Sequence, residues 1–127
     1  MRLLLDTHIL LWWLSDDRRL KAPERNAIAN PDAIVHVSGA TAWEIAIKKS
    51  LGRLDVDIDV LEREIEAGGM VELPIRWRHA GAVGTLPRHH DDPFDRMLVA
   101  QARIEGLVLV SYDPALRKYG GPMLPSL

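Results

Sequence analysis

Residues 3–14 are LLLDTHILLWWL, and this stretch decides the fold class. Three leucines are followed by an aspartate and then by a second apolar run that is too long and too rich in leucine for a strand. We therefore predict a short buried strand over Leu3–Asp6 and a helix over Thr7–Ser15. A lone buried carboxylate is costly, so we expect Asp6 to lie at the junction of the two elements and not to be a buried charge.

The rest of the chain alternates between strand-like and helix-like segments. The predicted strands are 33–38, 70–73, 107–111 and a short last one within 122–127, and the predicted helices are 22–30, within 39–52, 58–67, 77–83 and within 93–106. This alternation predicts parallel pairing and a layered α/β domain. In such sheets, sites form beyond the carboxyl ends of the strands, where the strand order reverses.

Composition limits the possible classes of protein. The 127 residues are 47% hydrophobic and 27% charged, which suits one domain with a real core. The absence of cysteine excludes a disulfide framework and thiolate metal sites and fits the cytoplasm. The longest apolar run is too short to span a membrane, and we see no secretion signal. A formal net charge of −2 is not typical of a nonspecific nucleic-acid binder, but a nucleic-acid enzyme stays possible.

Four carboxylates occupy comparable positions in this pattern. Asp6, Glu44 and Asp113 lie at or just after the carboxyl ends of predicted strands, which share one edge in a parallel sheet. Asp95 lies in the first turn of a predicted helix and would have to reach the same edge. Four carboxylates at one edge would repel one another unless a cation joined them. Mg²⁺ is the natural cation because it prefers oxygen ligands and leaves room for phosphate.

Each carboxylate also has a local interpretation as a cap or turn residue. These are a cap at Asp6 or Thr7, a capping box in TAWE (41–44), a cap at Asp92 with Asp95 favoured by the helix dipole, and a turn at Asp113. The residues alone leave both interpretations open, because the convergence of the four carboxylates is itself inferred.

Four motifs in order, LLLDTHILLWWL, SGATAWEIAIKKSLGRL, HHDDPFDRMLVAQARIEGLVLVSYD and the short tail, resemble the PIN-domain ribonucleases, in particular the VapC-type toxins of toxin–antitoxin pairs. The resemblance covers residues 1–127 as one domain. It implies a three-layer α/β/α fold around a parallel sheet, Mg²⁺- or Mn²⁺-dependent RNA hydrolysis, a homodimer and a cognate VapB-type antitoxin. It also implies that the catalytic metal ligands are Asp6, Glu44, Asp95 and Asp113.

Other polar residues are candidates for orienting these acids or contacting substrate. They are Thr7, Ser111, Asp92, Arg96, Arg88 and His89, with His90 beside the last. For Thr7 and Ser111 ordinary capping is equally favoured, for Asp92 a cap is the better interpretation, and for residues 88–90 a solvated loop is equally favoured. Arg96 would contact phosphate or neutralise the acidic edge. We interpret Lys48 and Lys49 as a solvated helix face.

The adjacent Trp12 and Trp13 point about 100° apart on a helix. We expect one of them in the core and regard the other as a candidate for the dimer or antitoxin surface.

The predicted function is that of a metal-dependent endoribonuclease toxin in which metal-activated water attacks the phosphodiester. A covalent mechanism has little support, since the chain contains no cysteine and no GxSxG motif. A receiver-like phosphoacceptor would need an acidic pair after the first strand and a lysine after the last core strand, where this chain has only Asp6 and then Asp113. A non-catalytic PIN-like binding module for RNA or protein stays open as the alternative.

Overall fold

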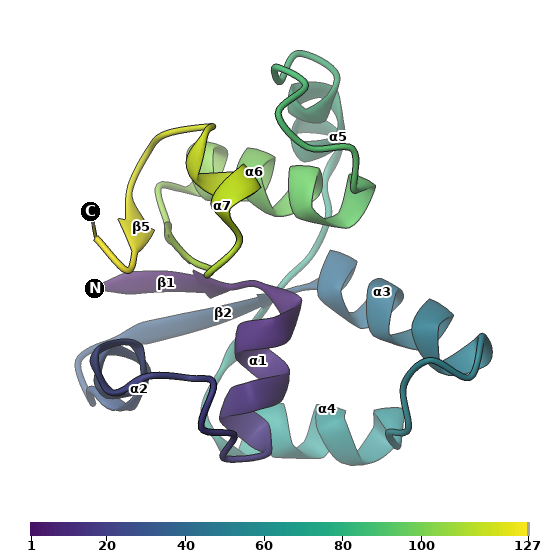
Figure 1. Ribbon diagram of the computed structural model, residues 1–127, viewed down its shortest axis with the longest axis vertical. Helices are drawn as coiled ribbons and strands as arrows, with labels where there is room; N and C mark the ends of the chain where they lie inside the picture. The colour runs from purple at the N-terminus through teal and green to yellow at the C-terminus, as the bar shows by residue number, and fades with distance from the viewer. Residues whose placement is uncertain (127) are drawn as a thin grey trace.

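The computed structural model describes residues 1–126, which form a parallel sheet between two layers of helices (Figure 1). The sheet has the order β3-β2-β1-β4-β5, and all of its pairs are parallel. The strands are β1 (Arg2–Leu5), β2 (Ile34–Ser38), β3 (Val71–Leu73), β4 (Val108–Val110) and β5 (Met123–Leu124). The helices are α1 (Thr7–Leu14), α2 (Ala22–Ala29), α3 (Gly39–Ser50), α4 (Ile58–Ala67), α5 (Trp77–Val83), α6 (Pro93–Glu105) and α7 (Pro114–Arg117).

The central strand β1 explains why the chain opens on an unbroken apolar run. Its side chains alternate between the two faces of the sheet. Leu4 packs in one hydrophobic cluster with residues of α6 and α7, whereas Leu3 and Leu5 pack in the other with residues of α1 and α2. All three leucines are fully buried, as expected for a parallel strand covered on both faces. The predicted three-layer α/β/α architecture is confirmed.

The chain order of the strands fixes where a site can form. From β1 the chain proceeds to β2 and β3 on one side of the sheet, and β4 and β5 lie on the other side of β1. The order therefore reverses between β1 and β4, and the crevice at their carboxyl ends is the position that open α/β sheets use for ligands. Asp6 follows β1 and Asp113 follows β4, so both flank this point.

The predicted elements are all present, but some local interpretations are wrong. Helix α3 begins at Gly39 with Ser38 as its N-cap, two residues before the proposed capping box, so Glu44 lies inside the helix and cannot cap it. Trp12 and Trp13 are both only partly buried against the same cluster, so neither is a core residue. The last strand spans Met123–Leu124, and Leu127 of the predicted segment lies outside the described residues.

Among residues 1–126, no helix combines the length and the apolar character that a membrane crossing would require.

Candidate functional site

Asp6 both caps a helix and carries a buried carboxylate. Its Oδ1 accepts a hydrogen bond from the Ile9 N–H at 2.9 Å, which caps α1. The residue is nevertheless only 5% exposed, so the expectation that it would not be a buried charge is wrong. Burial raises the pKa of Asp6, although hydrogen bonds from Ser111 and Ile9 oppose the rise, and the charge of Asp113 adds to it.

Glu44 is held from two sides within the protein. Thr7 Oγ1 donates to Glu44 Oε1 at 2.6 Å, and Lys48 Nζ lies 2.6 Å from Glu44 Oε2. Thr7 is therefore placed to orient a carboxylate. Lys48 is a site residue that the sequence interpretation missed, although the i,i+4 spacing of a glutamate and a lysine on one helix was a usable signal.

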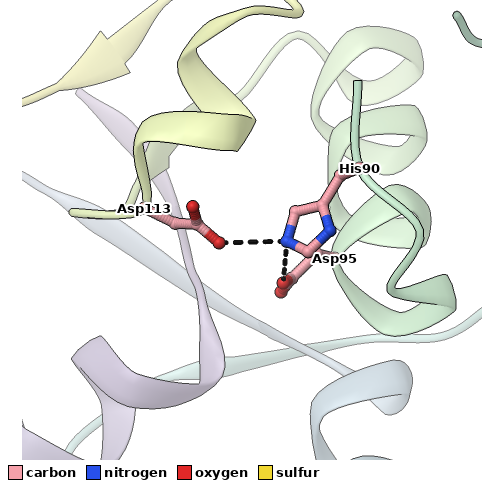
Figure 2. Close-up of side chains that lie close together, drawn as sticks. All are labelled: His90, Asp95 and Asp113. Atoms are coloured by element: carbon pink, nitrogen blue, oxygen red, sulfur yellow. Dashed lines mark hydrogen bonds and ion pairs between the residues drawn. The ribbon is translucent and has the colours of Figure 1, made fainter. Parts of the chain in front are cut away.

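Asp95 and Asp113 face each other across the imidazole of His90 (Figure 2). Asp113 Oδ1 caps α7 by accepting from the Ala115 N–H at 2.9 Å, while its Oδ2 lies 3.0 Å from His90 Nε2. The same nitrogen lies 3.1 Å from Asp95 Oδ2. One potential ligand atom from each of these three residues lies within 4.8 Å of the other two.

The pKa of Asp95 depends on the charges of other acids near it. Burial raises the pKa of Asp95 to about 7, and the charges of Asp92, Asp6 and Glu44 contribute to the rise, partly opposed by His90. Asp6 is in turn affected by the charge of Asp113, so each of the four carboxylates lies within electrostatic range of at least one other, and we call these four residues the acidic cluster. Capping and convergence are therefore not alternatives, because Asp6 and Asp113 each do both. An oxygen-only carboxylate set under mutual repulsion fits a hard divalent cation.

Ser111 and Asp92 lie close to this cluster without belonging to it. Ser111 is fully buried, and its hydroxyl accepts the Asp113 N–H at 3.0 Å and also bonds to Asp6. Asp92 Oδ1 accepts the N–H groups of Phe94 at 2.8 Å and Asp95 at 3.1 Å, which makes it the N-cap of α6. Ser111 thus links Asp6 and Asp113. Asp92 is the helix cap that the sequence favoured.

Arg96 lies beside Asp95 in the sequence, but its guanidinium binds a loop. It is 8% exposed and donates to the carbonyl oxygens of Val83 at 2.9 Å and Pro87 at 3.0 Å, and to the Tyr119 hydroxyl at 3.1 Å. These hydrogen bonds hold residues 83–90 against α6. Arg88 and His89 are exposed in that loop, and the His89 ring meets the Tyr119 ring edge-on at 5.0 Å.

A groove of about 490 Å³ opens beside Glu44, between α1 and the segment that follows α3. Thr7 and Lys48, the two residues that hold Glu44, line its end nearest the cluster. Its wall combines apolar side chains, which are Leu11, Trp12, Leu14, Leu54, Val56 and Leu61, with charged ones, which include Asp17, Arg19, Arg53 and Glu64. The groove therefore offers a partly apolar surface that extends to the two residues in contact with Glu44.

The metal-free protein is expected to lose stability as the pH rises through neutrality. The pKa of Asp95 is raised from 3.8 to about 7, so its contribution is fully present below about pH 4 and is lost as the pH passes about 7. In EDTA, the free energy of unfolding should fall from pH 5 to pH 8 by about 1–3 kcal/mol more in the wild type than in Asp95→Asn, part of the full effect being screened by solvent. Urea titrations at the two pH values measure this, and equal falls would contradict it.

Comparisons with known proteins agree with this fold. A family profile described as PIN domain matches residues 3–122. The protein Ribonuclease VapC22 of Mycobacterium tuberculosis (strain ATCC 25618 / H37Rv) is 30% identical over 121 residues, covering 94% of this chain and 92% of that protein.

Three solved structures are similar in fold. VapBC2 from Rickettsia felis, bound to a DNA fragment from its promoter, gives a TM-score of 0.71 at 12% identity and covers 97% of this chain and 96% of that one. VapBC-1 from nontypeable Haemophilus influenzae gives 0.63 at 19% identity, covering 94% and 92% of the two chains. FitAcB from Neisseria gonorrhoeae gives 0.59 at 18% identity, covering 95% of each. At these identities the likeness shows the fold alone.

Proposed function

Because the chain belongs to the PIN domain family, we propose that it is a VapC-type ribonuclease that cuts RNA endonucleolytically with Mg²⁺ or Mn²⁺. The observations that support this proposal are the grouping of Asp95 and Asp113 within 4.8 Å around His90 and the pKa of Asp95, which burial and the charges of Asp92, Asp6 and Glu44 raise to about 7. A cluster that is unfavourable to ionise on its own is stabilised by a divalent cation.

The residues proposed to hold the cation are Asp6, Glu44, Asp95 and Asp113. When bound, a divalent cation polarises the phosphate and makes water a stronger nucleophile at neutral pH. The neighbouring residues fix the carboxylates in place. Thr7 and Lys48 hold Glu44, and the N–H groups of Ile9 and Ala115 hold one oxygen each of Asp6 and Asp113. Asp113 is 36% exposed at its side chain, so an RNA phosphate can approach from solvent.

No covalent role is needed from the hydroxyls of the cluster. Thr7 already donates its proton to Glu44 at 2.6 Å, and Ser111 is fully buried behind Asp6 and Asp113. Thr7 is only 4% exposed, so both hydroxyls lie inside the protein, where a substrate phosphate does not reach them as it reaches a nucleophile. The arrangement therefore supports direct hydrolysis by water, which leaves a 5′-phosphate and a 3′-hydroxyl.

The proposal includes protein partners as well as RNA. We propose a cytoplasmic protein that is neutralised by a cognate VapB-type antitoxin, and the partly apolar groove beside Glu44 supports this by offering a surface for a peptide next to the acids. A second copy of the chain is proposed from the family resemblance. Trp77, which is 95% exposed on α5, supports it because exposed aromatic side chains are enriched at interfaces.

The test is RNA cleavage by purified protein that has been freed of any antitoxin and treated with EDTA. Structured RNAs such as total tRNA should stay intact in EDTA and be cut at internal positions once Mg²⁺ or Mn²⁺ is added. End-labelling should detect 5′-phosphates on the new ends. Cleavage that continues in EDTA would overturn the metal mechanism. A folded protein that cuts no RNA with either ion would instead support a non-catalytic binding module.

A further inference from the structure

His90 faces two carboxylates of the site with a nitrogen that carries a proton. Its Nε2 lies 3.0 Å from Asp113 Oδ2 and 3.1 Å from Asp95 Oδ2 (Figure 2). On the other side of the ring, Nδ1 accepts the backbone N–H of Asp92 at 3.2 Å. A ring nitrogen that accepts a hydrogen bond carries no hydrogen of its own, so the ring proton lies on Nε2. His90 is therefore a hydrogen-bond donor to Asp113, and Asp95 Oδ2 lies close to the same N–H.

The position of this ring is set by the fold of the loop. The His90 N–H donates to the Tyr119 hydroxyl at 3.2 Å, and Arg96 donates to that hydroxyl at 3.1 Å. Arg96 also holds Pro87 O of the same loop at 3.0 Å. The imidazole is thus attached at its backbone and at Nδ1, and its side chain is only 21% exposed.

The same contacts make His90 poorly suited to bind a metal ion itself. A ligating imidazole presents an unprotonated nitrogen to the metal and donates its other N–H to an acceptor. If Nε2 became the ligand, the proton would move to Nδ1, where it would face the Asp92 N–H, and two donors would meet. We therefore do not count His90 as a metal ligand, in contrast to Asp95 and Asp113, although one ligand atom from each of the three residues lies within 4.8 Å of the other two.

We propose that His90 is a positioning residue that, in the metal-free protein, holds Asp113 through its Nε2–H with Asp95 beside the same hydrogen, and that competes with the cation for their oxygens. The inference rests on the proposed metal centre. The Nε2–H carries partial positive charge between two carboxylate oxygens, where it reduces their repulsion. A cation that takes those oxygens requires His90 to give up this hydrogen bond, so the imidazole weakens cation binding and stabilises the metal-free fold.

The competition predicts that removing the imidazole tightens cation binding. Calorimetric titration of the full chain with MnCl₂ should give a Kd roughly tenfold lower for His90→Ala than for the wild type, the factor corresponding to one hydrogen bond to a charged group. His90→Gln, whose amide can donate from a similar position, should return the Kd toward the wild-type value. His89→Ala is the matched control, because the His89 ring meets Tyr119, and its Kd should not change.

A spectroscopic measurement tests the geometry without any substitution. The ring ¹⁵N shifts of His90 in metal-free wild-type protein should show the Nε2–H tautomer, and saturation with Mg²⁺ should alter the Nε2 resonance while Nδ1 stays an acceptor. This keeps the proposal testable even if His90→Ala does not fold. A proton found on Nδ1 would overturn the proposal.

The titrations distinguish the proposal from its competitors. A weaker Kd in His90→Ala would show that His90 is a ligand, and an unchanged Kd would show that it does not act on the cation; either result overturns the inference while leaving the proposed ribonuclease intact. A wild-type protein that binds no Mn²⁺ would overturn the proposed metal centre, and the inference with it.

Discussion

Asp95→Asn is expected to lower metal-dependent RNA cleavage by at least about two orders of magnitude, since even groups that only orient metal ligands are worth 10–100-fold. Asp95 lies at the centre of the cluster, where the charges of Asp6 and Glu44 both reach it and His90 lies 3.1 Å from its Oδ2. The amide cannot supply the negative charge that a divalent cation requires. Initial rates of cleavage at saturating Mn²⁺ measure the effect.

Asp92→Asn is the matched control on the same helix. It removes an equal charge three residues away, and asparagine caps a helix about as well as aspartate. Asp92 uses its Oδ1 to accept the N–H groups of Phe94 and Asp95, so we expect cleavage to stay within about tenfold of the wild type, the lower end of what outer groups contribute. Equal losses in the two variants would mean that the charge at the start of α6 matters and not the carboxylate at position 95.

Activity and stability should change in opposite directions in Asp95→Asn. Removing the charge relieves repulsion with its neighbours, so the metal-free variant should be more stable than the wild type at pH 8. A variant that is inactive and also more stable has lost a functional group and not its fold.

Much of the fold follows from local sequence patterns. The helix at Ile58–Ala67 and the helix at Trp77–Val83 have the predicted bounds, because a glycine directly follows each of them and the apolar spacing within them is helical. The strand order was not predictable in the same way, since it depends on which strands pair and not on any one segment.

The capping box shows how a local pattern misleads. TAWE has the required spacing, but the preceding strand ends at Ser38, whose hydroxyl caps the helix through the Ala40 N–H at 2.9 Å. Glu44 therefore lies one turn deeper and faces Thr7, which is 37 residues away in the sequence. A sequence pattern that spans only residues 41–44 contains no information about a partner so far away in the chain.

The positions of Asp6 and Asp113 at the ends of strands could be predicted, but the contacts of their neighbours could not. Asp6 and Asp113 follow strands that must end at one edge of a parallel sheet, which is a consequence of topology. His90 reaches the same edge only because its loop folds back onto α6. The loop is held there by Arg96, whose contacts come from residues up to 23 positions away.

Arg96→Met is expected to destabilise the protein by about 3–5 kcal/mol, because it removes several hydrogen bonds from a charged donor, each worth about 1.5–3 kcal/mol. Successive residues on a helix point about 100° apart, so Asp95 faces the carboxylates while Arg96 faces the loop. Its guanidinium donates to Val83 O and Pro87 O and to the Tyr119 hydroxyl. Methionine would fill most of the volume but remove the donor to Pro87 O, and it would leave Val83 O and the Tyr119 hydroxyl with only the N–H groups of Leu86 and His90. An unsatisfied buried acceptor costs about 1–3 kcal/mol.

Arg88→Met provides the comparison, because Arg88 is exposed in the loop that Arg96 holds. Urea unfolding should place it within about 0.5 kcal/mol of the wild type, so the difference between the variants isolates the buried contacts. Since domains of this size are stable by only about 5–15 kcal/mol, Arg96→Met should also melt well below the wild type. If Arg96→Met were instead as stable as Arg88→Met yet failed to cut RNA, Arg96 would be the phosphate-contacting residue that its place beside Asp95 first indicated, and the scaffold interpretation would be wrong.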